Sequence, residues 1–221
     1  MNTNTSINML DWLFILEGLG ITLILCLCSM VLGSILGVII GVMRASNIKV
    51  VNYLSWIYVY IIRGTPLLMQ LFLVYYGLPI LIGYSISAFS TALIGLTLYA
   101  AAYLAEIVKA GIQSVDVGQK EAAKALGMTH LQEFIYIVFP QALKVIIPPS
   151  AGFFIALIKD SSLVSAIGFM ELTRSSKLVI ARTFQPFTIY LIVALVYFIV
   201  CYGLSKLSRY VEGGLAANYG K

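Results

Sequence analysis

Charged residues are scarce in this chain of 221 residues. Asp, Glu, Lys and Arg make up 10% of it and hydrophobic residues 61%, whereas a water-soluble domain has about 25% charged residues. Long stretches lack charge altogether: Gly18–Met43 has 26 residues, Gly64–Ala105 has 42 and Thr183–Ser205 has 23. A helix needs about 20 apolar residues to cross the hydrocarbon core. The sequence therefore predicts an integral membrane protein.

Residue types that perform covalent or metal chemistry are also few. The chain has one histidine, His130, and three cysteines: Cys26 and Cys28 in the first apolar run and Cys201 in the last. Cys26 and Cys28 are two positions apart, so they point to different faces of a helix. We interpret all three as buried apolar thiols. An intramembrane enzyme would need a nucleophile–base pair or a metal cluster, so the chain is not predicted to be an enzyme.

The distribution of positive charge predicts the topology. Met1–Leu10 has no Lys or Arg, so the start does not resemble a cleavable signal. With the N-terminus outside, nine of the 14 Lys and Arg residues fall in cytoplasmic segments, four outside and one, Arg63, within a span. The fold class is thus an all-α membrane protein with one domain over residues 1–221, a cytoplasmic C-terminus and five spans near Leu13–Met43, Tyr53–Ile82, Ser87–Ile112, Pro140–Ile158 and Pro186–Leu207.

Glycine and proline mark where the spans pack or break. Gly33, Gly37 and Gly41 form overlapping small-xxx-small repeats, which let another helix approach closely in lipid. Pro66 interrupts the second span directly after Thr65. The backbone groups freed there must find partners inside the protein.

The long inner loop, about residues 114–136, contains the most informative pattern. Gln119–Leu126 is rich in helix formers, and Gly127 suits the position just past a helix end. Thr129 and Gln132 have the spacing of a capping box, which predicts a second short helix. A helix of about eight residues is marginal in water by itself. The segment is therefore either a solvated connector or a helix held by the rest of the chain or by a docked partner.

This loop resembles the conserved motif of ABC-importer permeases. That motif places Glu-Ala-Ala, Gly, Ile and Leu-Pro at fixed spacings, and the chain matches it with Glu121-Ala122-Ala123, Gly127, Ile137 and Phe139-Pro140, departing only by Phe for Leu. Three further segments are similar to the polar amino acid branch, whose members handle histidine, glutamine, arginine or lysine: Arg63–Leu68, Ala102–Ile107 and Lys159–Leu163. The likeness runs from about Glu17 to Arg209.

The resemblance implies a type I importer fold, in which two permease copies face each other in a prokaryotic inner membrane. Two cytoplasmic ATPase subunits would each take the short coupling helix in a groove, through Glu121, Ala122, Ala123 and Gly127. An external binding protein would deliver the amino acid. The chain has no Gly-x-x-x-x-Gly-Lys-Ser/Thr loop for phosphates. ATP and magnesium are therefore expected on the partner ATPase, with no cofactor in this chain.

Ionisable residues inside the membrane usually mark a transport path. Glu106 shares one face of the third span with Tyr99 and Tyr103. If the fourth span enters the bilayer near Pro148, Asp160 lies roughly 18 Å deeper, near mid-membrane. The candidate substrate residues are Glu106, Asp160, Lys159, Ser161, Ser162, Tyr99, Tyr103, Arg63 and Thr65. Alternatively, Lys159 and Asp160 neutralise each other, or pair with Glu106, in a purely structural role.

The predicted function is the permease subunit of an ATP-driven importer for a polar amino acid. The two acidic groups, Glu106 and Asp160, favour a basic one. A secondary carrier or channel for a small polar solute, working without ATP, is the alternative, although such a protein would not need the Glu121 loop. The sequence does not distinguish a pair of identical permease copies from a pair of related chains.

Overall fold

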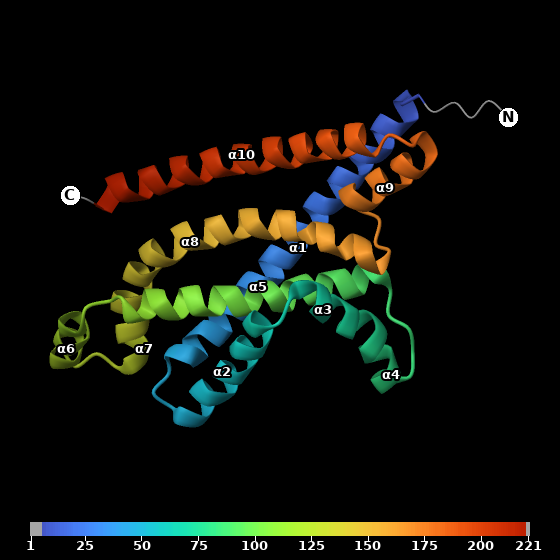
Figure 1. The fold of residues 1–221 in the computed structure, drawn as a ribbon. Coiled ribbons are helices and arrows are strands. Elements are labelled where there is room, and N and C mark those ends of the chain that lie inside the picture. The colour runs from blue at the N-terminus through green and yellow to red at the C-terminus, as the bar shows by residue number, and fades with distance from the viewer. Residues whose placement is uncertain (1–5, 220–221) are drawn as a thin grey trace. The chain divides into compact units, whose positions relative to one another are not determined.

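The computed structural model describes the backbone of residues 6–219, together with the side chains of residues 6–210 and 213 (Figure 1). All regular elements in this range are helices, so the predicted all-α fold is confirmed. They are α1 (Met9–Ala45), α2 (Lys49–Gly64), α3 (Leu67–Phe72), the π-helix η1 (Leu73–Gly77), α4 (Leu78–Ile82), α5 (Ala88–Gln113), α6 (Val117–Ala125), α7 (His130–Gln132), the π-helix η2 (Glu133–Val138), α8 (Phe139–Asp160), the 3₁₀ helix η3 (Ser161–Ile167), α9 (Leu172–Thr183) and α10 (Pro186–Tyr219).

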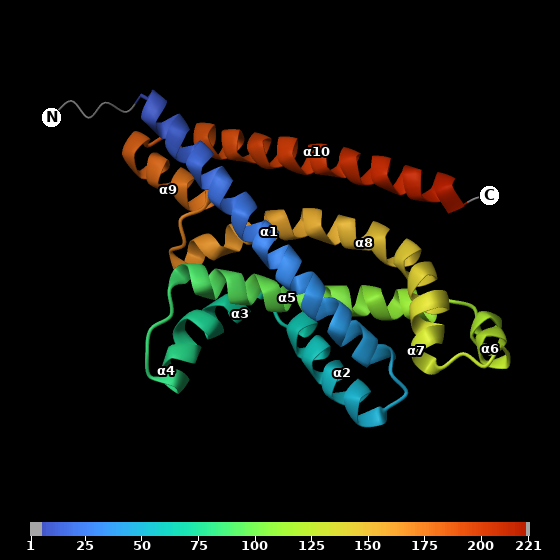
Figure 2. The same ribbon diagram turned by 180° about the vertical axis from the view of Figure 1, so that it is seen from behind.

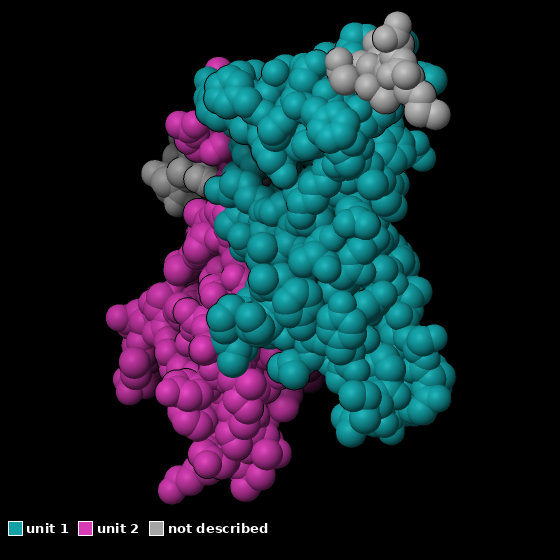
Figure 3. Space-filling view, turned by 45° about the vertical axis from the view of Figure 1, so that its right-hand side comes forward, with its two compact units in different colours: residues 1–31, 65–97, 155–204 teal, residues 32–64, 98–154, 205–221 magenta. Residues whose placement is uncertain are grey.

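The chain divides into two compact units, coloured separately in Figure 3. Unit 1 comprises residues 1–31, 65–97 and 155–204, and unit 2 comprises residues 32–64, 98–154 and 205–221. The boundaries fall inside α1, α5, α8 and α10 and at the junction of α2 with α3. Most spans therefore contribute one segment to each unit.

Several of these helices are long and apolar enough to cross a membrane. Within the described residues, four stretches qualify without interruption: Met9–Ala45, Ala88–Gln113, His130–Ile167 and Pro186–Tyr210. Lys49–Gly64 and Leu67–Ile82 qualify together as a bent pair. Counted as one broken span, this pair gives the five spans that the sequence predicts.

The break in the second span occurs at the predicted proline. Pro66 has an extended backbone, with φ −64° and ψ 136°, and α3 begins directly after it. The Gln70 amide donates to the carbonyl and to the hydroxyl of Thr65, at 3.0 Å in both cases. The Thr65 carbonyl at the break thus has a hydrogen-bond partner within the protein, which a polar group in the hydrocarbon region requires.

Unit 1 is built around an apolar cluster that joins α1, α9 and α10. Its buried members are Ile15, Leu172, Val179, Ile189 and Val193. Figures 1 and 2 both show α9 beside the N-terminal part of α1. The two approach closely at Gly18, where an added Cβ would lie 2.6 Å from the Ser175 hydroxyl oxygen. At the start of α1, the Asp11 carboxylate pairs with Arg182 of α9.

α9 has no counterpart among the helices predicted from the sequence. The helix starts at Glu171, whose fully buried carboxylate accepts hydrogen bonds from the backbone N–H groups of Thr173 (2.9 Å) and Arg174 (2.7 Å). Burial raises the pKa of this carboxyl, and the two N–H groups act in the opposite direction. The preferred capping residues are Ser, Thr, Asp and Asn. A glutamate in this role therefore gave no signal in the sequence.

Unit 2 is held by the predicted contact of small residues. A Cβ added at Gly37 would lie 2.7 Å from Leu104 Cβ, and one added at Gly41 would lie 2.6 Å from Val108 Cβ. Only glycine therefore lets α1 approach α5 so closely. The adjacent core joins α5 to η2 and α8 through Val108, Ile112, Val115, Val138, Ala142 and Ile146.

The inner loop confirms one predicted helix and corrects the other. α6 ends at Ala125, and Gly127, two residues further on, has φ 75°. The N–H groups of Gly127 and Met128 donate to Lys124 O (2.9 Å) and Ala123 O (3.1 Å). This pattern is a Schellman motif. The capping box of Thr129 is present. The helix that it starts is, however, no separate short element, because η2 continues it directly into α8.

The prediction that all three cysteines are buried is correct only for Cys26. Its side chain is 1% exposed, whereas Cys28 and Cys201 are partly exposed, and all three thiols are free. A cysteine thiol behaves as a small apolar group and needs no hydrogen-bond partner when it faces lipid. A membrane helix can therefore carry such a side chain on its outer surface.

The close contact of α1 with α5 gives the first prediction. Gly41→Ala places a methyl group 2.9 Å from Ala105 O as well as against Val108, and overpacking of this kind costs about 1–3 kcal/mol. We expect a lower melting temperature for the purified protein. Gly20→Ala on the same helix is the matched control, since nothing lies within 4 Å of its added Cβ. Equal melting temperatures for the two variants would contradict the packing account.

Candidate functional site

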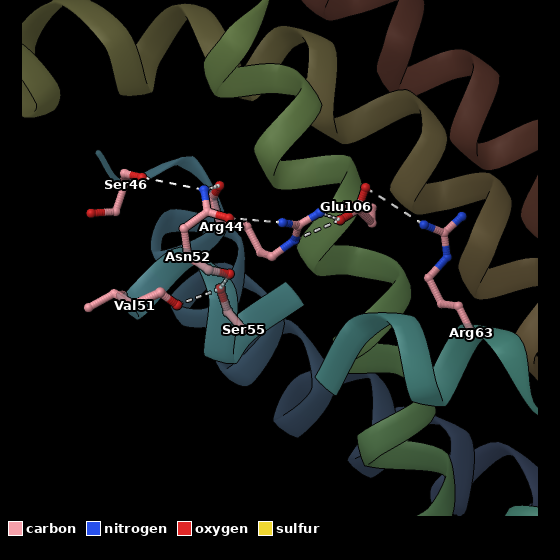
Figure 4. A network of polar contacts seen from close by, with 7 residues as sticks. All are labelled: Arg44, Ser46, Val51, Asn52, Ser55, Arg63 and Glu106. Atoms are coloured by element: carbon pink, nitrogen blue, oxygen red, sulfur yellow. Dashed lines mark hydrogen bonds and ion pairs between the residues drawn. The ribbon is translucent and has the colours of Figure 1, made fainter. Parts of the chain in front are cut away.

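The best-formed polar cluster of unit 2 centres on Glu106 of α5. Arg44, in the last turn of α1, donates to its Oε1 from Nε at 2.9 Å and from Nη2 at 2.7 Å. The Arg44 side chain is 7% exposed and that of Glu106 27%. Asn52 of α2 completes the arrangement, because it accepts from Arg44 Nη1 at 3.2 Å and donates to Arg44 O at 2.7 Å (Figure 4).

Arg63 approaches the same carboxylate from the end of α2. Its Nη1 lies 3.7 Å from Glu106 Oε2, and its side chain is 42% exposed (Figure 4). The guanidinium carbon also lies 5.1 Å from the centre of the Tyr103 ring, a cation–π distance. Arg63 is thus held more loosely than Arg44. It is the cation of the cluster that can reach another anion without leaving a buried charge unpaired.

Aromatic rings extend this cluster along α5 and α8. Tyr99 and Tyr103 lie one turn apart with ring centres at 4.7 Å, and Phe153 of α8 stacks on Tyr103 at 5.2 Å. Of the predicted substrate residues, Glu106, Arg63, Tyr99 and Tyr103 are therefore brought together in unit 2. Helical spacing predicted the shared face of Glu106, Tyr99 and Tyr103, and the structure adds Arg63 from α2.

A hollow of about 410 Å³ opens onto these side chains. This volume is within the range of small-molecule sites, about 300–1,000 Å³. Two guanidinium groups face one carboxylate, so the lining has a formal charge of +1. It can offer both a donor for a carboxylate and an acceptor for an ammonium group. The lining residues are Arg44, Trp56, Val59, Tyr60, Arg63, Gly64, Tyr103 and Glu106.

The other predicted substrate residues belong to unit 1. α8 ends at Asp160, two residues beyond the predicted end of the fourth span at Ile158, and continues as the 3₁₀ helix η3. Ser161 is fully buried and donates to Ile158 O at 2.7 Å. Lys159 and Ser162 line a hollow of about 460 Å³ with Tyr197. Thr65 accepts from Gln70 at the span break.

Four residues of this site were not among those predicted from the sequence: Arg44, Asn52, Trp56 and Tyr60. Arg44 directly follows the first uncharged run, so the positive-inside count assigned it to the cytoplasmic surface. The sequence does not show that the Arg44 side chain is buried. One signal was available, because Trp56, Tyr60 and Arg63 recur at helical spacing on one face of α2.

Within α6, Ala123 is the one buried residue. Glu121 and Ala122 lie on the surface of α6, and Ala123 is 2% exposed inside unit 2. Leu126, directly after the helix, is 82% exposed. Ala123 thus holds α6 against the rest of unit 2, while its neighbours present an outward surface with an apolar end.

Comparison with known proteins gives a consistent result. Residues 33–215 match the family described as binding-protein-dependent transport system inner membrane component. The arginine transport system permease protein ArtQ of Bacillus subtilis is 37% identical over 99% of this chain and 100% of its own length. The L-cystine transport system permease protein TcyB of the same organism is 38% identical over 91% of this chain and 86% of its own.

Solved structures agree. The crystal structure of an amino acid ABC transporter with histidines superimposes with a TM-score of 0.85 at 39% identity, covering 94% of this chain and 98% of that one. The MetNI methionine ABC transporter in an inward-facing conformation gives a TM-score of 0.82 at 21% identity, which bears on the fold alone. The chain therefore belongs to the binding-protein-dependent transport system inner membrane component family, as an amino-acid ABC transporter permease.

Proposed function

We propose that this permease forms the path by which an ATP-driven importer moves a polar amino acid of the basic type into the cytoplasm. The observation that supports this most directly is the Arg44–Glu106–Arg63 cluster, which faces a hollow of amino-acid size within a membrane protein. Charged groups inside a span are costly, and they persist where they serve a path or a site. Family membership argues against the alternative of an ion-driven carrier or channel.

The chemistry of the cluster suits a zwitterion. The α-carboxylate takes the place of Glu106 beside Arg63, forming a charge-assisted pair with the guanidinium. The α-ammonium group then meets Glu106 Oε2, while Arg44 continues to hold Oε1. Tyr99 and Tyr103 line the route. One pair within the protein is replaced by two pairs with the substrate, and no buried charge is left alone.

The preference for a basic amino acid rests on Asp160. Glu106 already faces two arginines. Its negative charge is therefore partly neutralised, and it attracts a cationic substrate side chain less than an unpaired carboxylate would. Asp160 is the acidic candidate of unit 1, which also contains Lys159, Ser161, Ser162 and Thr65, and a cationic side chain would meet it along the path. An arginine transport permease among the relatives supports this choice.

Energy coupling is proposed to run through α6. Glu121, Ala122 and the Gly127 turn would fit a groove of a cytoplasmic ATPase subunit, which binds the ATP and magnesium. The exposed apolar side chains of Val117 and Leu126 at the two ends of this region, 65% and 82% exposed, support a docking surface. Ala123 would act from inside by anchoring the helix.

The assembly would contain two permease copies, identical or related, two ATPase subunits and an external binding protein. The excess of Lys and Arg on one side supports an N-terminus outside and a C-terminus in the cytoplasm of a prokaryotic cell.

Single cysteines near Ser87 and Lys120 should then react from opposite sides with a membrane-impermeant thiol reagent. The test needs a background in which Cys26, Cys28 and Cys201 are replaced. Labelling of both positions from one side would contradict the topology.

The Gly127 turn gives a test of coupling. Gly127 has φ 75°, which a β-branched residue resists and Asn tolerates. Gly127→Val should lower uptake and release the ATPase subunit on co-purification, with membrane insertion unchanged. Gly127→Asn is the matched control and should keep most of both activities. Normal uptake by the valine variant would remove this loop from the coupling route.

Arg63 gives a test of the site. Arg63→Gln removes the donor for the α-carboxylate, which all amino acids share, so KM for every transported amino acid should rise about tenfold or more. Uptake of labelled arginine, histidine, glutamine and cystine by the assembled importer measures this. Arg209→Gln, an equal loss of charge on the exposed surface of α10, is the control. An unchanged KM for each transported amino acid would contradict the assignment.

A further inference from the structure

A row of aromatic rings runs along α2 toward the cluster of charges. Tyr53, Trp56, Tyr60 and Arg63 follow one another at steps of three and four residues, so they share one helix face. The Trp56 ring is stacked between its neighbours, with centroid distances of 5.8 Å to Tyr53 and 5.0 Å to Tyr60. Tyr53 and Tyr60 are 61% and 65% exposed.

This face of α2 is unsuited to contact with lipid tails. Arg63 lies 14 residues beyond Lys49, the first residue of α2, which is roughly 21 Å along the axis. Its side chain is 42% exposed on the same side as the rings. A cation at that depth is stable only beside water, other polar groups or another protein chain. The rings are therefore placed as the wall of a polar space.

Two hollows meet at Trp56. The first, of about 410 Å³, contains the Arg44–Glu106–Arg63 cluster, and the second, of about 290 Å³, lies toward the α1–α2 connection and is lined by Ser46, Asn47, Lys49, Asn52, Tyr53 and Trp56. Trp56 lines both. Arg44 lines the first hollow, and Asn52, to which it is hydrogen-bonded, lines the second.

We propose that the amino acid leaves the cluster along the aromatic face of α2, and that its ammonium group crosses the Trp56 ring on the way to the α1–α2 connection. Indole is the strongest of the aromatic partners for a cation. Tyr60 and Tyr53 provide rings before and after it, so the ammonium group is never far from a π face. This proposal rests on the proposed amino acid site, and it adds Trp56 as a residue that the substrate contacts.

The test compares two substitutions at Trp56 in the assembled importer. Trp56→Leu removes the π face and Trp56→Phe keeps one. For the panel amino acid that the unmodified importer takes up fastest, we expect Trp56→Leu to lower kcat about threefold to thirtyfold and Trp56→Phe to lower it less. KM should change little, because Arg63 and Glu106 still bind the substrate. Trp12→Leu and Trp12→Phe, at the other tryptophan of the chain, are the controls.

Several outcomes separate this proposal from its alternatives. Equal losses in the leucine and phenylalanine variants would assign Trp56 to packing and overturn the proposal. Dissociation of the two permease copies by Trp56→Leu would identify the face as an interface and also overturn it. A normal kcat for Trp56→Leu together with a raised KM for Arg63→Gln would reject the exit route and leave the binding site standing. An unchanged KM for Arg63→Gln would reject the site itself.

A second readout uses the indole directly. The fluorescence emission of the unmodified importer minus that of the Trp56→Phe variant reports Trp56 alone. Adding the same amino acid should change this difference spectrum. No change at saturating amino acid would contradict contact between Trp56 and the substrate.

Discussion

The carboxylate of Glu106 is shared by two arginines, and the burial of one of them constrains the rest of unit 2. Arg44 is 7% exposed at the end of a span, so it requires a permanent anionic partner there. Glu106 supplies it from α5, and Asn52 supplies two further hydrogen bonds from α2. The close glycine contact between α1 and α5 brings the two charges within reach. The site is thus an outcome of helix packing.

The difference in exposure between the two arginines gives them different roles. Arg44 is enclosed and fixes the position of Glu106, whereas Arg63 lies at the end of the first half of a broken span with part of its side chain accessible. The break at Pro66 is what ends α2 at this point, and Gln70 satisfies the backbone that it frees. A broken helix therefore presents a charge to the hollow without leaving unpaired backbone groups in the membrane.

Much of this arrangement follows from local rules that a sequence displays. Uncharged runs identify the spans. Pro66 marks the break and Gly127 marks the turn after α6, because each of these two features depends on one residue type in one conformation. The continuation of the loop helix into α8 was not predicted. Thr129 marks where that helix begins, but no residue signals how far it extends.

Two other features depend on tertiary contacts and have no local signal. α9 starts at a buried glutamate that is not a preferred cap, and its apolar residues become a core only against α1 and α10. Arg44 looks like an ordinary positive residue at a span end until its burial is known. The rings of α2 were visible in the sequence, but only the hollows beside them indicate a role.

A double-mutant cycle on Arg44 and Glu106 tests the central claim, that this buried pair organises the site. Thermal unfolding of the assembled importer would be measured for Arg44→Gln, Glu106→Gln and the double variant. Each single change leaves one charge without its main partner, so each should lower the melting temperature strongly, and the double variant should recover part of the loss. Strictly additive losses would contradict the account, because they would show that the two residues act independently.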